Sequence, residues 1–309
     1  MYKTDFAWPD GAHIAVVFNM SWEIPPTHHL APLPKQKYKR AMRPVYETAF
    51  ADTGGMQRLL DLWQRHNIKT SVYADGLGVS LFHGVAKEAA DAGHEFIVQG
   101  WDHGFLYEQT VDEQKKSIVD TNEAFLKVLG KKATGFSSAG GHLTAETFDI
   151  LAELDFKYSC GLRNAEVPFI IRVGNKKMVG MTSYAVSDTP TARGMAPREV
   201  VTMWRDYFDA LYDEGRRGYP KMLAYGTHPV LAHGHRTRPL EEVIEYVKSK
   251  EKVWITTRGE IADWVLKKYP EHDLAKFYPE AVASDKHYGL GIGLGGEEAR
   301  KVSFHFREE

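Results

Sequence analysis

The sequence of 309 residues contains one cysteine, Cys160, and no apolar run long enough to cross a bilayer. A single cysteine excludes an intrachain disulfide and is typical of a reducing compartment. The first residues also lack the apolar core of a signal peptide, so we expect a cytoplasmic protein with no membrane partner. An excess of charge of one sign is missing too. The 39 basic and 41 acidic residues leave a formal net charge of −2, which argues against nucleic acid as a partner.

Hydrophobic residues make up 43% of the chain, enough for a large core. Short apolar runs alternate with segments of helical periodicity, which predicts parallel strands joined by helices. Polar clusters follow four different strands, and a barrel brings such ends together at one mouth. We therefore predict an α/β fold of the distorted, TIM-like barrel type over residues 1–268. We expect residues 269–309 to form an extension that packs on the barrel or on a neighbouring subunit of a homo-oligomer. The predicted strands are 14–18, 68–73, 95–98, 133–136, 177–182, 222–225 and 253–256.

The first polar cluster ends the first strand. Asn19, Ser21 and Glu23 occupy alternate positions, so their side chains point to one side if the strand continues. Glu23 is a candidate base or metal ligand, while Asn19 and Ser21 suit hydrogen bonds to a substrate amide. Trp22 is expected to wall the pocket. A loop carboxylate in a salt bridge is the alternative interpretation of Glu23.

The second cluster ends the strand 95–98. His103 is a candidate for proton transfer or metal binding, and Gln99 is a candidate reader of substrate amides. Trp101 is expected to form a second wall of the pocket. If a metal is present, Asp102 and His103 could join Glu23 as ligands. A histidine that caps a helix is the alternative for His103.

The third cluster follows the strand 222–225. His228 comes directly after that strand and suits a general acid. Asp188 is a weaker candidate for the substrate pocket. Residues 138–142 close another strand, and their two glycines either bring backbone N–H groups to a ligand or simply make a turn. No Gly-x-Ser-x-Gly elbow is present, so a serine nucleophile is disfavoured.

Four stretches together resemble the polysaccharide deacetylase superfamily, also called NodB-like or carbohydrate esterase 4. The resemblance is strongest to its branch of allantoinases and cyclic imide hydrolases, and it covers residues 7–265. It implies a distorted (β/α)7 barrel, in agreement with the strand count. The stretches are 8–16, 93–101, 143–154 and 253–262.

The resemblance also implies site residues. The superfamily's metal triad is an aspartate and two histidines, and here Ser21 stands at the aspartate position and Gln99 at the first histidine. Only His103 matches, and a late histidine is retained as His228. Asn19 lies where the superfamily has its base aspartate, and Ser137 and Ser138 stand where it has an arginine. Zinc is therefore possible, although most of the triad is missing.

These observations predict a hydrolase of a non-peptide carbon–nitrogen bond in a small cyclic amide, imide or ureide. Glu23, His103 and His228 would be its catalytic residues. Two alternatives remain. One is a metal-dependent N-deacetylase of polysaccharides or amino sugars, and the other is a non-catalytic barrel that binds a ligand.

Overall fold

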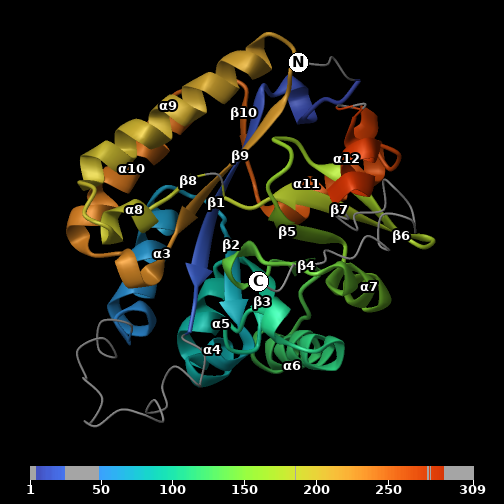
Figure 1. Cartoon of the computed structure of the whole chain (residues 1–309). Helices are drawn as coiled ribbons and strands as arrows, with labels where there is room; N and C mark the ends of the chain where they lie inside the picture. The colour runs from blue at the N-terminus through green and yellow to red at the C-terminus, as the bar shows by residue number, and fades with distance from the viewer. Residues whose placement is uncertain (1–4, 25–48, 185, 277, 279, 289–309) are drawn as a thin grey trace, which may run out of the picture.

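The structure is a computed structural model that describes residues 5–24, 49–184, 186–276, 278 and 280–288. Ten strands form one curled sheet, and the longer helices lie around its outer face (Figure 1). The strands are β1 (Ile14–Trp22), β2 (Ser71–Asp75), β3 (Glu95–Gly100), β4 (Gly135–Phe136), β5 (Tyr158–Leu162), β6 (Phe169–Val173), β7 (Lys176–Thr182), β8 (Val186–Ser187), β9 (Lys221–Thr227) and β10 (Val253–Ile255). The helices are α3 (Met56–Arg65), α4 (Gly76–Leu81), α5 (His83–Asp91), α6 (Val111–Leu129), α7 (Ala145–Glu153), α8 (Thr189–Ala192), α9 (Pro197–Arg216), α10 (Gly234–Lys248), α11 (Arg258–Lys268) and α12 (Ala281–Tyr288).

The sheet follows the order β6-β7-β5-β4-β3-β2-β1-β9-β8. Every pairing on this path is parallel except that of β6 with β7. Strand β9 pairs with Ile14–Met20 of β1, so β10 and β2 share the other edge of β1 at its two ends. Because the strands are parallel, their carboxyl ends gather at one mouth. The predicted α/β fold with a barrel-like, largely parallel sheet is confirmed.

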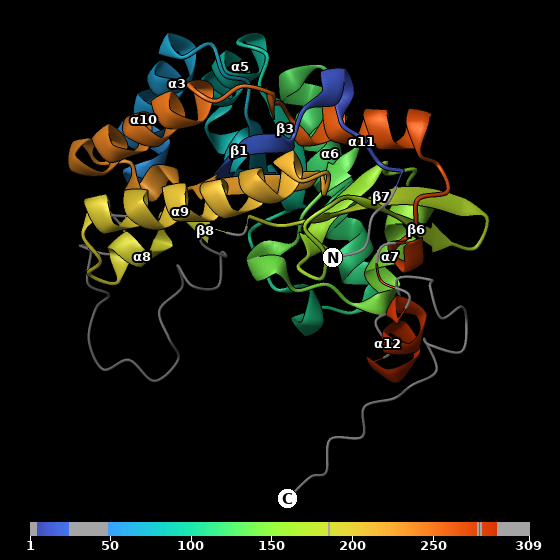
Figure 2. The same ribbon diagram turned by 90° about the horizontal axis from the view of Figure 1, so that it is seen from above.

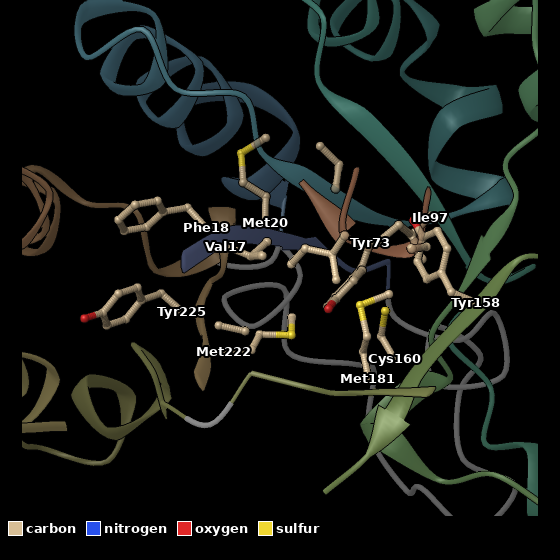
Figure 3. Packing of buried hydrophobic residues seen from close by; sticks show 14 of the residues in the cluster. Val17, Phe18, Met20, Tyr73, Ile97, Tyr158, Cys160, Met181, Met222 and Tyr225 are labelled. Atoms are coloured by element: carbon tan, nitrogen blue, oxygen red, sulfur yellow. The ribbon is translucent and has the colours of Figure 1, made fainter. Parts of the chain in front are cut away.

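Side chains of β1 alternate between the two faces of the sheet. Phe18 points outward, where its ring lies 5.5 Å from that of Trp63 on α3 and 5.2 Å from that of Tyr225. Figure 3 shows Phe18 and Tyr225 on the helix side, away from Tyr73 and Cys160 in the interior. All nine residues of β1 are buried, as expected for a strand covered on both faces. The helices α9 and α10 pack side by side over one flank of the sheet (Figure 2).

A fully buried arginine bridges strands that do not pair with each other. The Nε atom of Arg258 donates to Asn19 Oδ1 of β1 at 3.3 Å, and Nη1 donates to the carbonyl of Thr182 at the end of β7. Its backbone N–H donates to Ser71 Oγ at 2.9 Å. The guanidinium therefore ties β1 to β7 across the interior of the curled sheet, and it uses the amide of Asn19 to do so.

Most elements agree with the predictions, and the differences lie in one region. Thr110 and Glu113 form a capping box at the start of α6, and Gly130 ends that helix with a φ of +76°. Between the predicted strands 133–136 and 177–182, where no strand was expected, the chain forms β5 and β6. The Pro-rich segment from 25 to 43 lies outside the described residues.

The described part of the C-terminal extension lies against β6. The N–H of Ile170 donates to the carbonyl of His272 at 2.8 Å, and Ile170 forms a bridge with Asp273. The packing of residues beyond 288 and the oligomeric state stay predictions. Within the described ranges, no helix combines the length and apolar character needed to cross a bilayer.

Candidate active site

A cavity of about 400 Å³ opens at the carboxyl ends of the strands. That volume falls within the range of small-molecule sites. Its lining comes from segments that are far apart in the sequence, including strands β2 and β3, helix α8 and the turns after β1, β4, β5, β7 and β9. The lining residues are Glu23, Tyr73, Gln99, His103, Phe105, Ser137, Ser138, Gly140, Gly141, Arg163, Ser183, Tyr184, Thr189, Ala192, His228, Val230 and Leu231.

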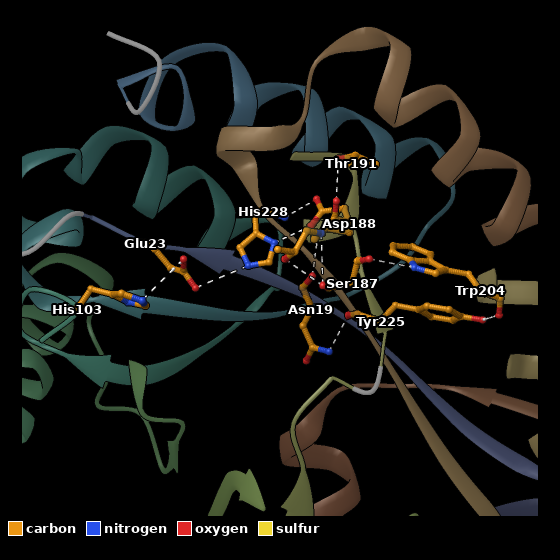
Figure 4. Close-up of polar contacts among 11 residues, drawn as sticks. Asn19, Glu23, His103, Ser187, Asp188, Thr191, Trp204, Tyr225 and His228 are labelled. Carbon is orange, nitrogen blue, oxygen red and sulfur yellow. Dashed lines mark hydrogen bonds and ion pairs between the residues drawn. The ribbon is translucent and has the colours of Figure 1, made fainter. Parts of the chain in front are cut away.

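Glu23 lies between two histidines. Its Oε1 atom is 3.7 Å from Nε2 of His228, and its Oε2 atom is 3.8 Å from Nε2 of His103. Figure 4 shows the carboxylate pointing toward both rings. Each ring is backed by a second carboxylate on its other nitrogen. The result is a continuous row of alternating acids and bases: Asp75, His103, Glu23, His228 and Asp188.

His228 is held by Asp188 at two points. Nδ1 of His228 is 2.6 Å from Asp188 Oδ1, and the backbone N–H of His228 donates to Asp188 Oδ2 at 2.8 Å. Burial alone would lower the pKa of His228, but the charges of Asp188 and Glu23 outweigh it and raise the pKa to about 9. His228 is therefore an imidazolium at neutral pH, with Nε2–H directed toward Glu23.

His103 is placed by an unusual backbone conformation. Its φ of 58° lies in the left-handed region, which costs a non-glycine residue about 1 kcal/mol. This conformation puts the ring between Glu23 and the fully buried Asp75, whose Oδ2 is 3.7 Å from Nδ1. Burial opposes the charged ring, but Asp75 and Glu23 together raise the pKa of His103. Asp75 is fixed in turn because its Oδ2 accepts the N–H of Ile24 at 2.8 Å.

The structure brings together some of the predicted substrate-binding residues. Gln99 lines the cavity, and its buried Oε1 has no hydrogen-bond partner among the described residues. Asp188 reaches the site through His228. Asn19 does not line the cavity, because its amide donates to the carbonyl of Tyr225 at 2.8 Å and accepts from Arg258. Ser21 is buried behind the lining.

The two tryptophans lie behind the cavity rather than along it. Trp22 points outward from β1, where its Nε1–H donates to Asp52 Oδ1 at 2.8 Å. The ring of Trp101 lies beside Gly76 at the start of α4. Asp102 is not among the lining residues either.

The cavity residues do not fit a divalent metal. Both ring nitrogens of His103 and of His228 face carboxylates, and both rings have raised pKa values. A metal ligand must offer a deprotonated nitrogen lone pair. In the described part of the chain, three donor atoms come within 4.8 Å of one another only at His66, Glu241 and Glu245 on the outer surface. We derive no step through a metal.

Sequence reasoning missed several residues of the site: Asp75, which is buried behind His103, and two residues of the cavity lining, Arg163 and Tyr184. Asp75 directly precedes a glycine that starts α4, which makes it look like an ordinary turn residue. Arg163 and Tyr184 come from the region whose strands were not predicted. The alternation of β1 could have excluded Trp22, because it falls between Ser21 and Glu23 and so faces the opposite side.

The chain is similar to known proteins over part of its length. A family model described as polysaccharide deacetylase matches residues 46–159. The resemblance to the polysaccharide deacetylase superfamily is confirmed. A peptidoglycan deacetylase from Helicobacter pylori is 25% identical over 257 residues, which are 72% of this chain and 87% of that protein.

Solved structures show the same fold. The crystal structure of Puue allantoinase superimposes with a TM-score of 0.77 at 23% identity, covering 85% of this chain and 93% of that one. A probable polysaccharide deacetylase from Pseudomonas aeruginosa PAO1 also gives a TM-score of 0.77 at 23% identity, covering 85% and 94%.

Proposed function

We propose that this protein hydrolyses a carbon–nitrogen bond, other than a peptide bond, in a small cyclic amide, imide or ureide, and that it does so without a metal. The observation that carries the proposal is the position of Glu23 between the rings of His103 and His228, each backed by an aspartate. Such a row supplies a base, an acid and positive charge in one cavity. The comparisons support a hydrolase of this bond class.

The row can complete one hydrolytic cycle. Glu23 takes a proton from a water molecule, and the water oxygen forms a bond to the substrate carbonyl carbon. The ring N–H groups of His103 and His228 stabilise the charge that develops on the carbonyl oxygen. His228 then gives its Nε2 proton to the leaving nitrogen as the carbon–nitrogen bond breaks. Glu23 returns the first proton to His228 across their 3.7 Å separation, so one water is consumed and the enzyme is restored.

The cavity walls suit a compact polar substrate. Hydroxyl and amide groups come from Gln99, Ser137 and Ser138, and the Oγ of Ser138 is buried without a partner among the described residues. Gly140 and Gly141 have φ values of 62° and 78°, a turn that places backbone along the lining. These groups can pair with the N–H and C=O edges of a ring amide.

A second candidate function is the removal of an N-acetyl group from an amino sugar. It is favoured by the match to the H. pylori protein, which is named as a peptidoglycan deacetylase. The same row of residues could carry out that reaction by the same steps. The two functions differ in their products, because cleavage of a ring amide opens the ring whereas deacetylation releases acetate.

The proposal is tested with wild-type protein and the Glu23→Gln variant on hydantoins, cyclic imides, ureides and N-acetylglucosamine oligomers. We expect ring opening by the wild type and a loss of at least about a hundredfold in Glu23→Gln, because a general base typically contributes that much. Glu251→Gln is the matched control, since Glu251 is exposed and does not line the cavity. Wild-type rates in Glu23→Gln would refute the proposal. Acetate release without any ring opening would favour the second candidate.

A further inference from the structure

The cavity contains a third cation, Arg163, which the catalytic row does not use. Arg163 follows β5, and its Nε–H donates to Ser183 Oγ at 2.8 Å. Ser183 is itself fixed, because it is buried and its N–H donates to the carbonyl of Leu162 at 3.2 Å. The hydroxyl therefore orients the guanidinium without neutralising its charge.

The remaining nitrogens of Arg163 have no partner within the described ranges. No carboxylate of those ranges lies within 4 Å of its guanidinium, and its Nη1 and Nη2 atoms make no hydrogen bond there. Its neighbour on the wall, Tyr184, is uncharged, because burial raises the pKa of that phenol to about 12. Arg163 thus presents an unpaired positive charge and a planar set of donors to the cavity.

The other two cations of the lining are already paired. His103 lies between Asp75 and Glu23, and His228 lies between Glu23 and Asp188. Arg163 makes no ion pair with the carboxylates of this row and lies on a separate part of the wall. A guanidinium in this position matches the two oxygens of a carboxylate.

We propose that Arg163 selects substrates that carry a carboxylate, which the guanidinium binds while the scissile carbonyl lies at Glu23. This inference rests on the proposed function and narrows its substrate class to anionic amides. Arg163 is an exposed residue of the cavity wall, so it suits a substituent that stays partly in water. Its effect should therefore appear in binding rather than in the chemical step.

Binding is measured by calorimetry in the Glu23→Gln background, where turnover does not interfere. The first probe pair is dihydroorotate and dihydrouracil, cyclic ureides with and without a carboxylate. The second pair is N-acetylmuramate and N-acetylglucosamine, amino sugars of which only the first carries a carboxylate, on a lactyl ether. We expect the carboxylated member of one pair to bind on the order of tenfold more tightly, as for a charge-assisted hydrogen bond that water partly screens. Arg163→Gln should remove this preference, and Arg163→Lys should restore part of it.

Arg193→Gln is the matched control, because Arg193 is exposed and lies outside the cavity lining. It tests whether removing one positive charge anywhere near the site weakens anion binding as much as removing Arg163 does. Equal weakening in both arginine variants would overturn the inference. So would equal binding within both probe pairs, or no measurable binding of either carboxylated probe. If the Arg163-dependent preference is found while Glu23→Gln retains full turnover, the inference stands and the proposed catalytic role fails.

Discussion

Replacing Asp188 by Asn tests whether the carboxylate of Asp188 keeps His228, the proposed general acid, protonated. The pKa of His228 is raised from an ordinary 6.5 to about 9, against burial and by the charges of Asp188 and Glu23. A change of that size corresponds to roughly 3 kcal/mol of preference for the charged ring. Asparagine keeps an oxygen for the backbone N–H of His228 but removes the charge beside Nδ1. The pKa of His228 should then fall toward its ordinary value.

The consequence for activity depends strongly on pH. At pH 8 a ring with a pKa of 9 is about nine-tenths protonated, whereas one with a pKa of 6.5 is protonated in only about 3% of molecules. Asp188→Asn should therefore lower kcat/KM by up to roughly thirtyfold at pH 8 and change it little at pH 6. The measurement is a pH–rate profile of both proteins, with the exposed Asp206→Asn as a charge-matched control. An alkaline limb that stays near pH 9 in Asp188→Asn would refute the assignment of His228 as the acid.

The same pair of residues links pH to stability. Folding raises the pKa of His228, so its contribution to the free energy of unfolding is fully present below pH 6.5 and is lost as the pH rises through about 9. Urea denaturation at pH 6 and pH 9.5 should show this loss in the wild type and a smaller one in Asp188→Asn. An equal loss in the two proteins would mean that Asp188 does not stabilise the charged ring.

Four further predictions concern the second histidine, the metal and two glycines outside the cavity. Asp75→Asn should also lower the alkaline limit of activity, but less than Asp188→Asn, because its ion pair with His103 is longer at 3.7 Å; a pH–rate profile measures this. Prolonged treatment with a chelator should leave kcat/KM unchanged, and a loss that zinc restores would contradict the metal-free chemistry. Gly55→Ala should cost roughly 1–3 kcal/mol in urea denaturation, because its Cβ would lie 2.0 Å from the carbonyl oxygen of Pro229. Gly84→Ala has open space in α5 and should instead gain roughly 0.5–1 kcal/mol.

The elements of the barrel that could be predicted are those whose sequence pattern does not depend on a neighbouring element. Strand β1 is continuous and apolar, and α6 has its capping box and its terminal glycine, so both can be recognised without knowing their neighbours. Strand β5 cannot be recognised in this way, because the sizes of its side chains depend on the neighbouring strand β4. Tyr158 of β5 fills the space that a side chain at Gly135 would need, as a Cβ there would lie 2.0 Å from the ring. Large and small residues that fit across two strands leave no periodic pattern in either one.

The site could be predicted in part for a similar reason. Glu23, His103 and His228 follow strong strands, and parallel strands bring such residues together. The role of Asp75 depends on the left-handed φ of 58° at His103, which no residue pattern in the sequence indicates. Asn19 has the expected position, but its amide is used by Arg258, which comes 239 residues later in the chain. The ends of strands can be predicted from the sequence, but the partner of each polar group cannot.

The histidines of the row can supply positive charge that a metal ion would otherwise bring to the reaction. A divalent ion would bring two positive charges next to the attacked carbonyl. Here the charged ring of His228 supplies positive charge, and Asp75 and Asp188 favour the protonated forms of His103 and His228 by raising their pKa values. A proton and a metal ion compete for the same ring nitrogen, so the aspartates oppose metal binding to the extent that they raise the pKa values of the two rings. We infer that Asp75→Asn combined with Asp188→Asn would lower both pKa values and give the site measurable affinity for zinc, which calorimetry at pH 8 would detect. If the double variant bound no more zinc than the wild type, the aspartates would not be what excludes the metal.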